Sequence, residues 1–161
     1  MMPQTAQTPG LLQRIARLES EIAALRRAGW ERDEMPFYPT SLHGLAYEDA
    51  TAFTTLWEGI LSPRTATLAL GLVFIGDQVG TTNTGGAWQV LFNDTTVVAS
   101  GSVPATFSFS FASLSLDLTP YRAARQLKVQ INVRRTSGAT TGGKFGTGGC
   151  IGGAPTYARL I

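Results

Sequence analysis

The 161-residue sequence predicts a mainly β protein, with a jelly-roll or β-sandwich head preceded by a short N-terminal α-helical coiled coil. Residues 11–28 are almost all strong helix formers, and their apolar residues recur with heptad spacing. After Pro36 the composition changes to Thr, Ser, Gly, Val, Leu and Phe, and apolar residues alternate with other residues. Because only 15% of residues are charged and 43% are hydrophobic, we expect most of the chain to fold.

These composition changes divide the chain into four segments. We expect a flexible leader at 1–10, a trimeric coiled coil at 11–28, a linker at 29–40 and the head domain at 41–161. Gly29, Pro36 and Pro39 are the residues expected to end the helix. The leader is polar and has no targeting pattern, and no apolar run is long enough to cross a bilayer, so we expect no membrane insertion.

The helical segment carries a narrow apolar stripe. Its apolar residues are spaced four, three, four and three apart, which places Ile at heptad position a and Leu at position d. Arg14 and Glu21 then fall at g, and Glu19 and Arg26 fall at e. In a parallel coiled coil, g of one chain faces the following e of its neighbour, so both pairs are opposite in charge and favour a parallel, in-register homo-oligomer. The stripe consists of Leu11, Ile15, Leu18, Ile22 and Leu25.

Two signals bear on the number of strands in this coiled coil. Ile at a with Leu at d favours a dimer. The segment from Arg14 to Glu19 resembles a short motif of parallel trimers, in which the Arg pairs with the Glu of the next chain. We favour three strands. The alternative is an amphipathic helix that packs on its own domain, although such a helix usually has a broader apolar face.

The β region contains three clear period-2 segments, at residues 67–74, 88–93 and 127–134. We expect one face of each segment to lie in a core. These faces are the Leu68 set (Leu68, Leu70, Leu72 and Phe74), the Trp88 set (Trp88, Val90 and Phe92) and the Leu127 set (Leu127, Val129, Ile131 and Val133). Turn-rich stretches separate the segments. Six to nine short strands with Gly/Thr turns fit a sandwich or jelly roll. The turns are expected at 80–86, at Asn93-Asp94 and at 137–153, with a last strand at 155–161.

A run of alternating Phe and Ser has a change of phase. Phe107, Phe109 and Phe111 are on odd positions, whereas the apolar residues from Ala112 onward are on even positions. A one-residue slip would turn half of a strand inside out, so we predict a β-bulge or a corner near Phe111. The three Phe side chains are expected in the core or at a subunit interface, because such an edge would aggregate if exposed.

The residues that carry catalytic or metal chemistry are sparse. The chain has one Cys and one His, which excludes an internal disulfide framework and leaves little for a zinc site. We expect His43 in a loop, Cys150 as a buried or packed thiol, and Trp57 with Trp88 in the core. The net charge of +2 gives no argument for nucleic acid. The sequence therefore predicts a protein that is not an enzyme, with no cofactor and no metal.

Two Gly/Thr-rich loops, at 80–86 and 137–153, are the candidates for ligand contact. Loops on a rigid β scaffold commonly carry recognition, although a flexible connecting loop is an equal alternative for 137–153. The candidate residues are Thr81, Thr82, Asn83, Thr84, Thr140, Thr141 and Lys144.

The order of parts looks like that of phage tail-fibre, receptor-binding and head-fibre proteins. Residues from Ala52 onward resemble the C-terminal jelly-roll domains of actinobacteriophage minor tail proteins. The shared features are residues 54–59 (TTLWEG), the hairpin with Asn93, residues 116–121 (LDLTPY) and the strand at 127–134. These are turn and strand motifs, so no functional residue is carried over. The chain departs from that family in being short, without a long shaft.

The resemblance implies a homotrimeric virion protein that assembles in the host cytoplasm. Its N-terminus would bind other virion proteins, and its head would contact host cell-surface carbohydrate. A capsid decoration or head-fibre protein without a receptor is one alternative. A cellular C1q/TNF-like or lectin-like trimeric binding module is another.

Overall fold

The computed structural model describes residues 8–30, 44–141 and 149–161. The chain forms two compact units, Met1–Met35 and Pro36–Ile161, each described here by itself. The division lies inside the range that the sequence marks as a linker. His43, the candidate ligand residue Lys144 and the first seven residues of the predicted leader lie outside the described residues.

The described residues of the first unit form one helix, α1 (Thr8–Trp30). It begins three residues before the predicted start and ends two residues after the predicted end. Pro9 lies in the first turn, where the N–H that proline lacks would have no helical partner. The expectation that Gly29 ends the helix is wrong, because α1 continues through it to Trp30. A single glycine near a helix end costs only about 1 kcal/mol, which neighbouring helix formers can offset.

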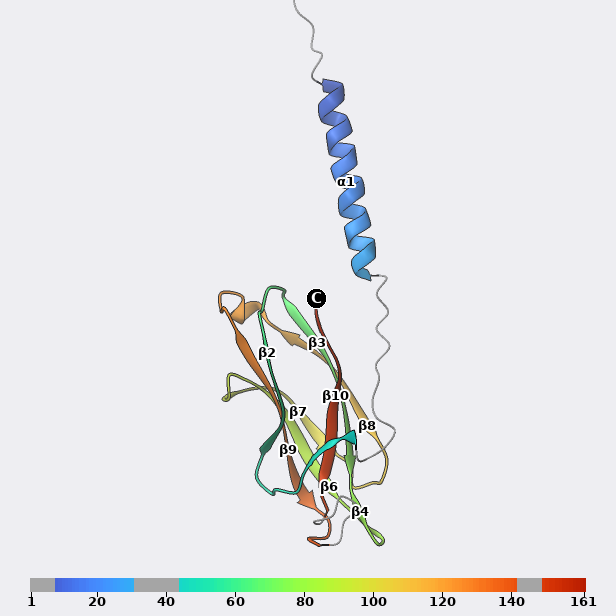
Figure 1. Cartoon of the computed structure of the whole chain (residues 1–161), viewed down its shortest axis with the longest axis vertical. Coiled ribbons are helices and arrows are strands. Elements are labelled where there is room, and N and C mark those ends of the chain that lie inside the picture. Colours follow the sequence, from blue (N-terminus) through green and yellow to red (C-terminus); the bar gives the residue numbers. More distant parts are fainter. Residues whose placement is uncertain (1–7, 31–43, 142–148) are drawn as a thin grey trace, which may run out of the picture. The chain divides into compact units, whose positions relative to one another are not determined.

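The second unit is mainly β, and its strands form antiparallel sheets (Figure 1). A 3-10 turn at Thr119–Tyr121 lies between two of the strands. The strands are β1 (Ala46–Glu48), β2 (Thr54–Leu61), β3 (Thr67–Gly76), β4 (Gln78–Val79), β5 (Thr82–Asn83), β6 (Gly85–Phe92), β7 (Thr96–Val103), β8 (Ser110–Asp117), β9 (Leu127–Ser137) and β10 (Ile151–Leu160).

Two four-stranded sheets make up most of this unit. One has the order β1-β10-β3-β8 and the other the order β2-β9-β6-β7, while β4 and β5 form a separate hairpin. The central strands β10 and β3 pair along nearly their full length, whereas β1 pairs only with Ile151–Gly153 of β10. The arrangement is consistent with a β-sandwich.

The core lies where the two sheets face each other. It combines alternate residues of β3, from Leu68 to Phe74, with alternate residues of β6 and β9. Phe92 is fully buried, and its ring meets that of Tyr121 edge to face at a centroid distance of 5.2 Å. Trp88 stacks on Phe74 at 5.6 Å. The core faces predicted from the period-2 pattern of the Leu68, Trp88 and Leu127 sets are therefore confirmed.

Of the β-bulge or corner predicted near Phe111, the bulge is wrong, and the chain bends earlier, at residues 105–108. β8 starts only at Ser110 and pairs with β3 in unbroken register as far as Asp117. Within β8 the even residues face inward, so Phe111 faces outward and is 58% exposed. Phe107 and Phe109 precede the strand and pack on a second cluster around Val73 and Ile75. The change of phase is thus the boundary between a loop and a strand.

The hairpin predicted at Asn93-Asp94 is confirmed. It joins β6 to β7, and Asn93 and Asp94 have φ values of 50° and 67°, as a type I′ turn requires. The prediction for the last strand needs a correction, because β10 begins at Ile151 rather than at residue 155. Its first three residues, Ile151–Gly153, belong to the strand because they pair with β1 on one side and with β3 on the other.

Candidate functional site

The loop predicted at 80–86 is a short hairpin followed by the start of β6. β4 and β5 pair through Gln78–Asn83 and Val79–Thr82, with Gly80 and Thr81 between them. Gly80 has a φ of +57°, which residues with side chains rarely adopt. The turn leaves Thr81 and Thr82 exposed at the tip.

The base of this hairpin is tied to the start of β10. The Asp77 amide donates to the Cys150 carbonyl at 2.8 Å, and the Thr84 amide donates to the Asp77 carbonyl at 2.8 Å. The Asp77 carboxylate is fully buried and accepts a hydrogen bond from the Gln78 amide at 2.7 Å. These bonds hold the two candidate loops against each other, although they are more than 50 residues apart in sequence.

Glycines allow the second loop to approach the first. Gly138 has a φ of +114°, and a Cβ atom there would lie 2.5 Å from Thr84 Oγ1. A Cβ atom on Gly149 would collide with the same hydroxyl, and the Gly149 amide donates to the Ala139 carbonyl at 2.8 Å. We call residues 77–85, 137–141 and 149–150 the loop end.

Cys150 lies at the base of the loop end and is fully buried. Its Sγ donates to Asp77 Oδ2 at 3.8 Å. Burial, followed by the negative charge of Asp77, raises the pKa of the Cys150 thiol to about 12. A thiol in this state is a poor nucleophile near neutral pH, and the prediction that Cys150 is buried is confirmed.

The candidate ligand residues are not equivalent. Thr81, Thr82, Thr140 and Thr141 are exposed at the loop end, while Asn83 is half-buried. The assignment of Thr84 to a ligand loop is wrong, because its side chain is fully buried under the two loops. Its position cannot be read from local sequence, since the covering glycines come from the other loop.

The apolar stripe of α1 is exposed. Ile15, Leu18 and Ile22 are 43%, 55% and 49% exposed, which is high for large aliphatic side chains at regular spacing. Arg17 pairs with Glu21 across one turn, with Nε and Oε1 2.9 Å apart. Of the other residues predicted in the coiled coil, Arg14 and Glu19 are exposed, and the side chains of Leu11, Leu25 and Arg26 lie outside the described residues.

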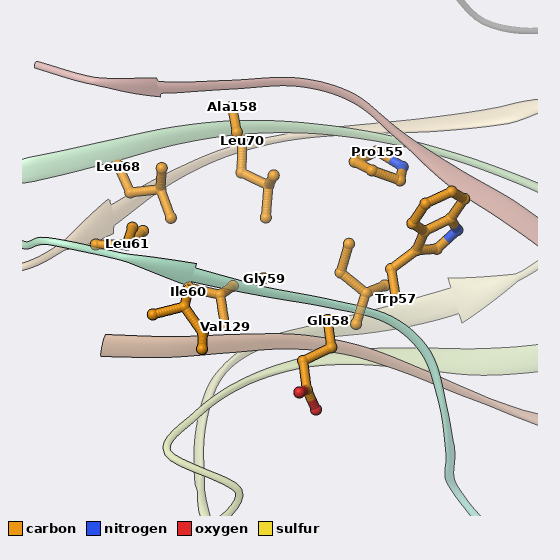
Figure 2. Close-up of a pocket in the computed structure, with 11 residues that line it drawn as sticks. Trp57, Glu58, Gly59, Ile60, Leu61, Leu68, Leu70, Val129, Pro155 and Ala158 are labelled. Atoms are coloured by element: carbon orange, nitrogen blue, oxygen red, sulfur yellow. The ribbon is translucent and has the colours of Figure 1, made fainter. Parts of the chain in front are cut away.

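A groove opens between the two sheets at the end of the second unit away from the loop end (Figure 2). It has a volume of about 220 Å³ and is lined by residues of β2, β3, β9 and β10. Leu68 and Leu70 form its floor. Trp57 stands at its rim and is 40% exposed, and Gly59 follows it along β2. Ile60 is 66% exposed, and its side chain points to the outer face of the sheet, as that of Glu58 does. We call this feature the edge groove.

The position of Trp57 corrects the prediction that it belongs to the core. β2 is an edge strand, and its register with β9 shifts between Thr55 and Trp57. The indole therefore lies at the side of the sandwich, and its Nε1 donates to the Gly153 carbonyl of the opposite sheet at 2.9 Å. Strand order decides which strand is an edge, and no local pattern around Trp57 reports it.

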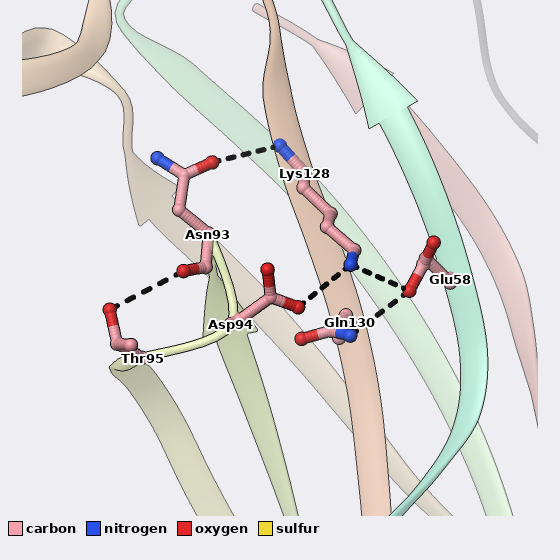
Figure 3. Close-up of polar contacts among 6 residues, drawn as sticks. All are labelled: Glu58, Asn93, Asp94, Thr95, Lys128 and Gln130. Carbon is pink, nitrogen blue, oxygen red and sulfur yellow. Dashed lines mark hydrogen bonds and ion pairs between the residues drawn. The ribbon is translucent and has the colours of Figure 1, made fainter.

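A polar network on the outer face of the β2-β9-β6-β7 sheet was not predicted. Lys128 Nζ lies 2.7 Å from Asp94 Oδ1 and 3.1 Å from Glu58 Oε2, and Gln130 Nε2 donates to the same Glu58 oxygen at 3.0 Å (Figure 3). Hydrogen bonds to Asp94 and then Glu58 raise the pKa of Lys128. The three charges come from three separate strands or turns, so only strand register reveals them.

The described residues contain no group of three or more His, Cys, Asp or Glu side chains that could hold a metal ion. In the same part of the chain, no helix is long and apolar enough to span a membrane. A scan against protein-family models finds no match, and a search of curated proteins finds none that is significant.

Proposed function

We propose that the chain is a structural, non-enzymatic virion protein of a phage, a homotrimeric tail fibre or receptor-binding tip whose head contacts host-surface glycan. The observation that carries this proposal is the exposed apolar stripe of α1 on a chain that also carries a separate β unit. A helix with such a stripe gains stability by associating with copies of itself. A second unit on the same chain is then presented in several copies.

The charges of α1 support a parallel assembly of three chains. The stripe is narrow, and Arg14 with Glu19 has the spacing of the trimer motif that the sequence resembles. The 23 residues of the helix span about 35 Å at 1.5 Å per residue. A parallel stalk of this kind would place all N-termini at one end, which suits attachment to other virion proteins.

The strand order supports a jelly roll as the finer description of the head. When the small β4-β5 hairpin is left out, the remaining eight strands divide evenly between the sheets β1-β10-β3-β8 and β2-β9-β6-β7. Reading across the two sheets gives the pairs β1/β2, β10/β9, β3/β6 and β8/β7, which are neighbours in sequence. A rolled-up antiparallel ribbon has this order, and jelly rolls occur in viral capsid and lectin domains.

The loop end is the proposed glycan-contact surface. Thr81, Thr82, Thr140 and Thr141 present exposed hydroxyls on a base held by buried hydrogen bonds. Hydroxyl groups can both donate to and accept from sugar hydroxyls, but each such site would be weak. Three identical weak sites gain affinity on a repetitive surface polymer, so trimerisation and recognition support each other.

The test measures binding of purified protein to actinobacterial cells and cell-wall fragments, the hosts implied by the sequence resemblance. We expect the native protein to sediment with the mass of three chains and to bind. A variant with Thr81→Arg and Thr140→Arg should keep this mass and lose binding, whereas the matched control Gln126→Arg, at an exposed position before β9, should bind normally. A trimer that binds no host fraction would support the capsid-decoration alternative instead.

A further inference from the structure

The edge groove lies on the side of the sandwich formed by β2 and β10. On this side the two sheets are joined near the loop end and are open at the other end. β1 covers only the first three residues of β10, and Trp57 joins the sheets through its bond to Gly153. Beyond this point, no described strand pairs with the outer edge of β10 from Ala154 to Leu160. The apolar side chains between the sheets are therefore left open along β2.

The chemistry of the edge groove fits a polypeptide better than a sugar. The polar atom of Trp57 is already bonded to Gly153. Glu58 points away from the groove, and its carboxylate is held by Lys128 and Gln130 (Figures 2 and 3). A sugar ligand would need side-chain hydrogen-bond partners along the walls of the groove. The apolar surface of another polypeptide would need only apolar contact.

An apolar edge strand of this kind is a hazard unless another chain covers it. β2 exposes Trp57 on the groove side of an unpaired edge and Ile60 on its outer face, and Glu58 is its only charged residue. Soluble proteins usually protect edge strands with charges, bulges or a covering segment. The bulge after Thr55 protects the start of β2, but Trp57–Leu61 lies beyond it, in regular register with β9.

We infer that the edge groove is the contact between the heads of neighbouring copies of this chain; the inference rests on the proposed trimer. The complementary g and e charges of α1 bring identical chains together in parallel. Residues 31–43 join α1 to the described head, and 13 residues span at most about 45 Å. Tethered heads then meet at effective concentrations on the order of millimolar. A helix of this length associates weakly alone, so head contacts must add to it.

A ring of three heads joins two different surfaces of each head. The edge groove is on the side of β2 and β10, so its counterpart lies on the opposite flank, where β7 and β8 are the edge strands. Val97 on this flank is 52% exposed. Val97 pairs with Leu91 of β6, and the next residue of β6, Phe92, pairs with Val129 in the wall of the groove. Val97 and the groove therefore lie at the same level along the strands. Val97 is the residue that we assign to the neighbouring groove.

The experiment separates head association from stalk association in the full-length chain. Ile15→Asp with Ile22→Asp disables the stalk, and sedimentation equilibrium then measures the remaining association of the heads. We expect oligomers in this background, and we expect Gly59→Arg, on the groove side of β2, or Val97→Arg to raise the dissociation constant at least tenfold. A Cβ atom on Gly59 meets no atom within 4 Å and Val97 is exposed, so both variants should fold, which urea melts would check. Thr140→Arg at the loop end is the matched control and should leave the mass unchanged.

Three outcomes would overturn the inference. A stalk-disabled protein that has the mass of a single chain at 100 µM would show that the heads do not associate. An unchanged mass for Gly59→Arg would place the head contact elsewhere. Binding of a fluorescent apolar probe that Gly59→Arg abolishes without changing the mass would make the edge groove a small-ligand site. None of these results touches host-cell binding, so the proposed function fails or survives on its own test.

Discussion

The loop end and the edge groove lie at opposite ends of β3, near Gly76 and Leu68 respectively, and they differ in chemistry. At the loop end, buried backbone hydrogen bonds and close glycine contacts support a surface of exposed threonines. At the edge groove, large apolar side chains face an opening with space around them. One sandwich framework therefore presents a polar, tightly supported surface at one end and an apolar, open surface at the other.

This difference follows from how each end of the sandwich is closed. The loop end is sealed by chain connections that cross between strands, so its backbone must be packed and hydrogen-bonded. The edge groove is left where a short edge strand, β1, stops before its neighbour does. Polar surfaces that remain in water suit reversible contact with a glycan, whereas an exposed apolar opening is best covered permanently.

Two glycines give the largest expected contrast between the ends. A Cβ atom on Gly76 would collide with the backbone carbonyl of Thr84, so Gly76→Ala should lose roughly 3 kcal/mol or more of unfolding free energy. Gly59 at the edge groove has no atom within 4 Å of such a Cβ, and Gly59→Ala should change stability by less than about 0.5 kcal/mol. Urea melts at equal protein concentration measure both. Similar losses for the two variants would contradict the contrast in packing.

Much of the sandwich could be predicted from the sequence because period-2 alternation is a local signal. Leu68, Trp88 and Leu127 lie in strands that have one apolar face, and each of these faces is in the core. The Asn93-Asp94 turn was also readable, since both residues tolerate positive φ. The glycine and threonine loops could be located, and four of their threonines are exposed.

The remaining features depend on contacts between distant segments. The burial of Thr84 is set by Gly138 and Gly149, and the edge position of Trp57 is set by the order of strands. Phe111 follows the pattern of β8 rather than that of the Phe residues before it, because pairing with β3 fixes where the strand begins. No single-sequence pattern contains this information, since register and strand order are properties of the assembled sheets.

The second largest effect is expected from ionisation of Cys150 at the loop end. Its pKa is about 12 in the folded protein and 9.0 as the reference for the unfolded chain. A raised folded pKa means that the stability it provides is complete below pH 9 and is lost between pH 9 and pH 12. We expect a slope of at most about 1.4 kcal/mol per pH unit in this window. Cys150→Ala should remove this slope, and the difference between the two proteins cancels the titration of Lys and Tyr.

Thiol chemistry gives an independent check on Cys150. A thiol reagent at pH 8 should modify the protein only after unfolding in urea, because the folded state keeps the thiol both buried and protonated. Rapid modification of the folded protein would mean that the loop end opens readily, and its assignment as the tightly supported end would then be wrong.

A smaller effect is expected at Thr84. Its hydroxyl is buried and has no hydrogen-bond partner among the described residues. Thr84→Val removes the unsatisfied group at nearly constant volume and should raise the unfolding free energy by about 1 kcal/mol. The matched control Thr82→Val alters an exposed hydroxyl and should change stability by less than about 0.5 kcal/mol. A clear loss of stability in Thr84→Val would show that the hydroxyl has a partner and that the loop end is polar to its base.

The smallest effect is expected from Lys128, which lies beside the edge groove on the outer face of its sheet. Asp94 and Glu58 raise the pKa of Lys128, so any stability from these pairs is present below pH 10.5 and is lost as the pH rises through the higher folded value. Asp94 and Glu58 are exposed to water and Lys128 is partly exposed, so these pairs are screened by salt and their contribution should be close to the error of a melt. Lys128→Met should therefore shift the urea midpoint slightly at low salt and not at 1 M NaCl. Glu58→Gln tests the same network from β2, because it removes one charge and keeps the shape of the side chain. A large, salt-independent loss in either variant would mean that this face is covered in the native protein, and the covered surface would then extend from the edge groove onto the outer face of the sheet.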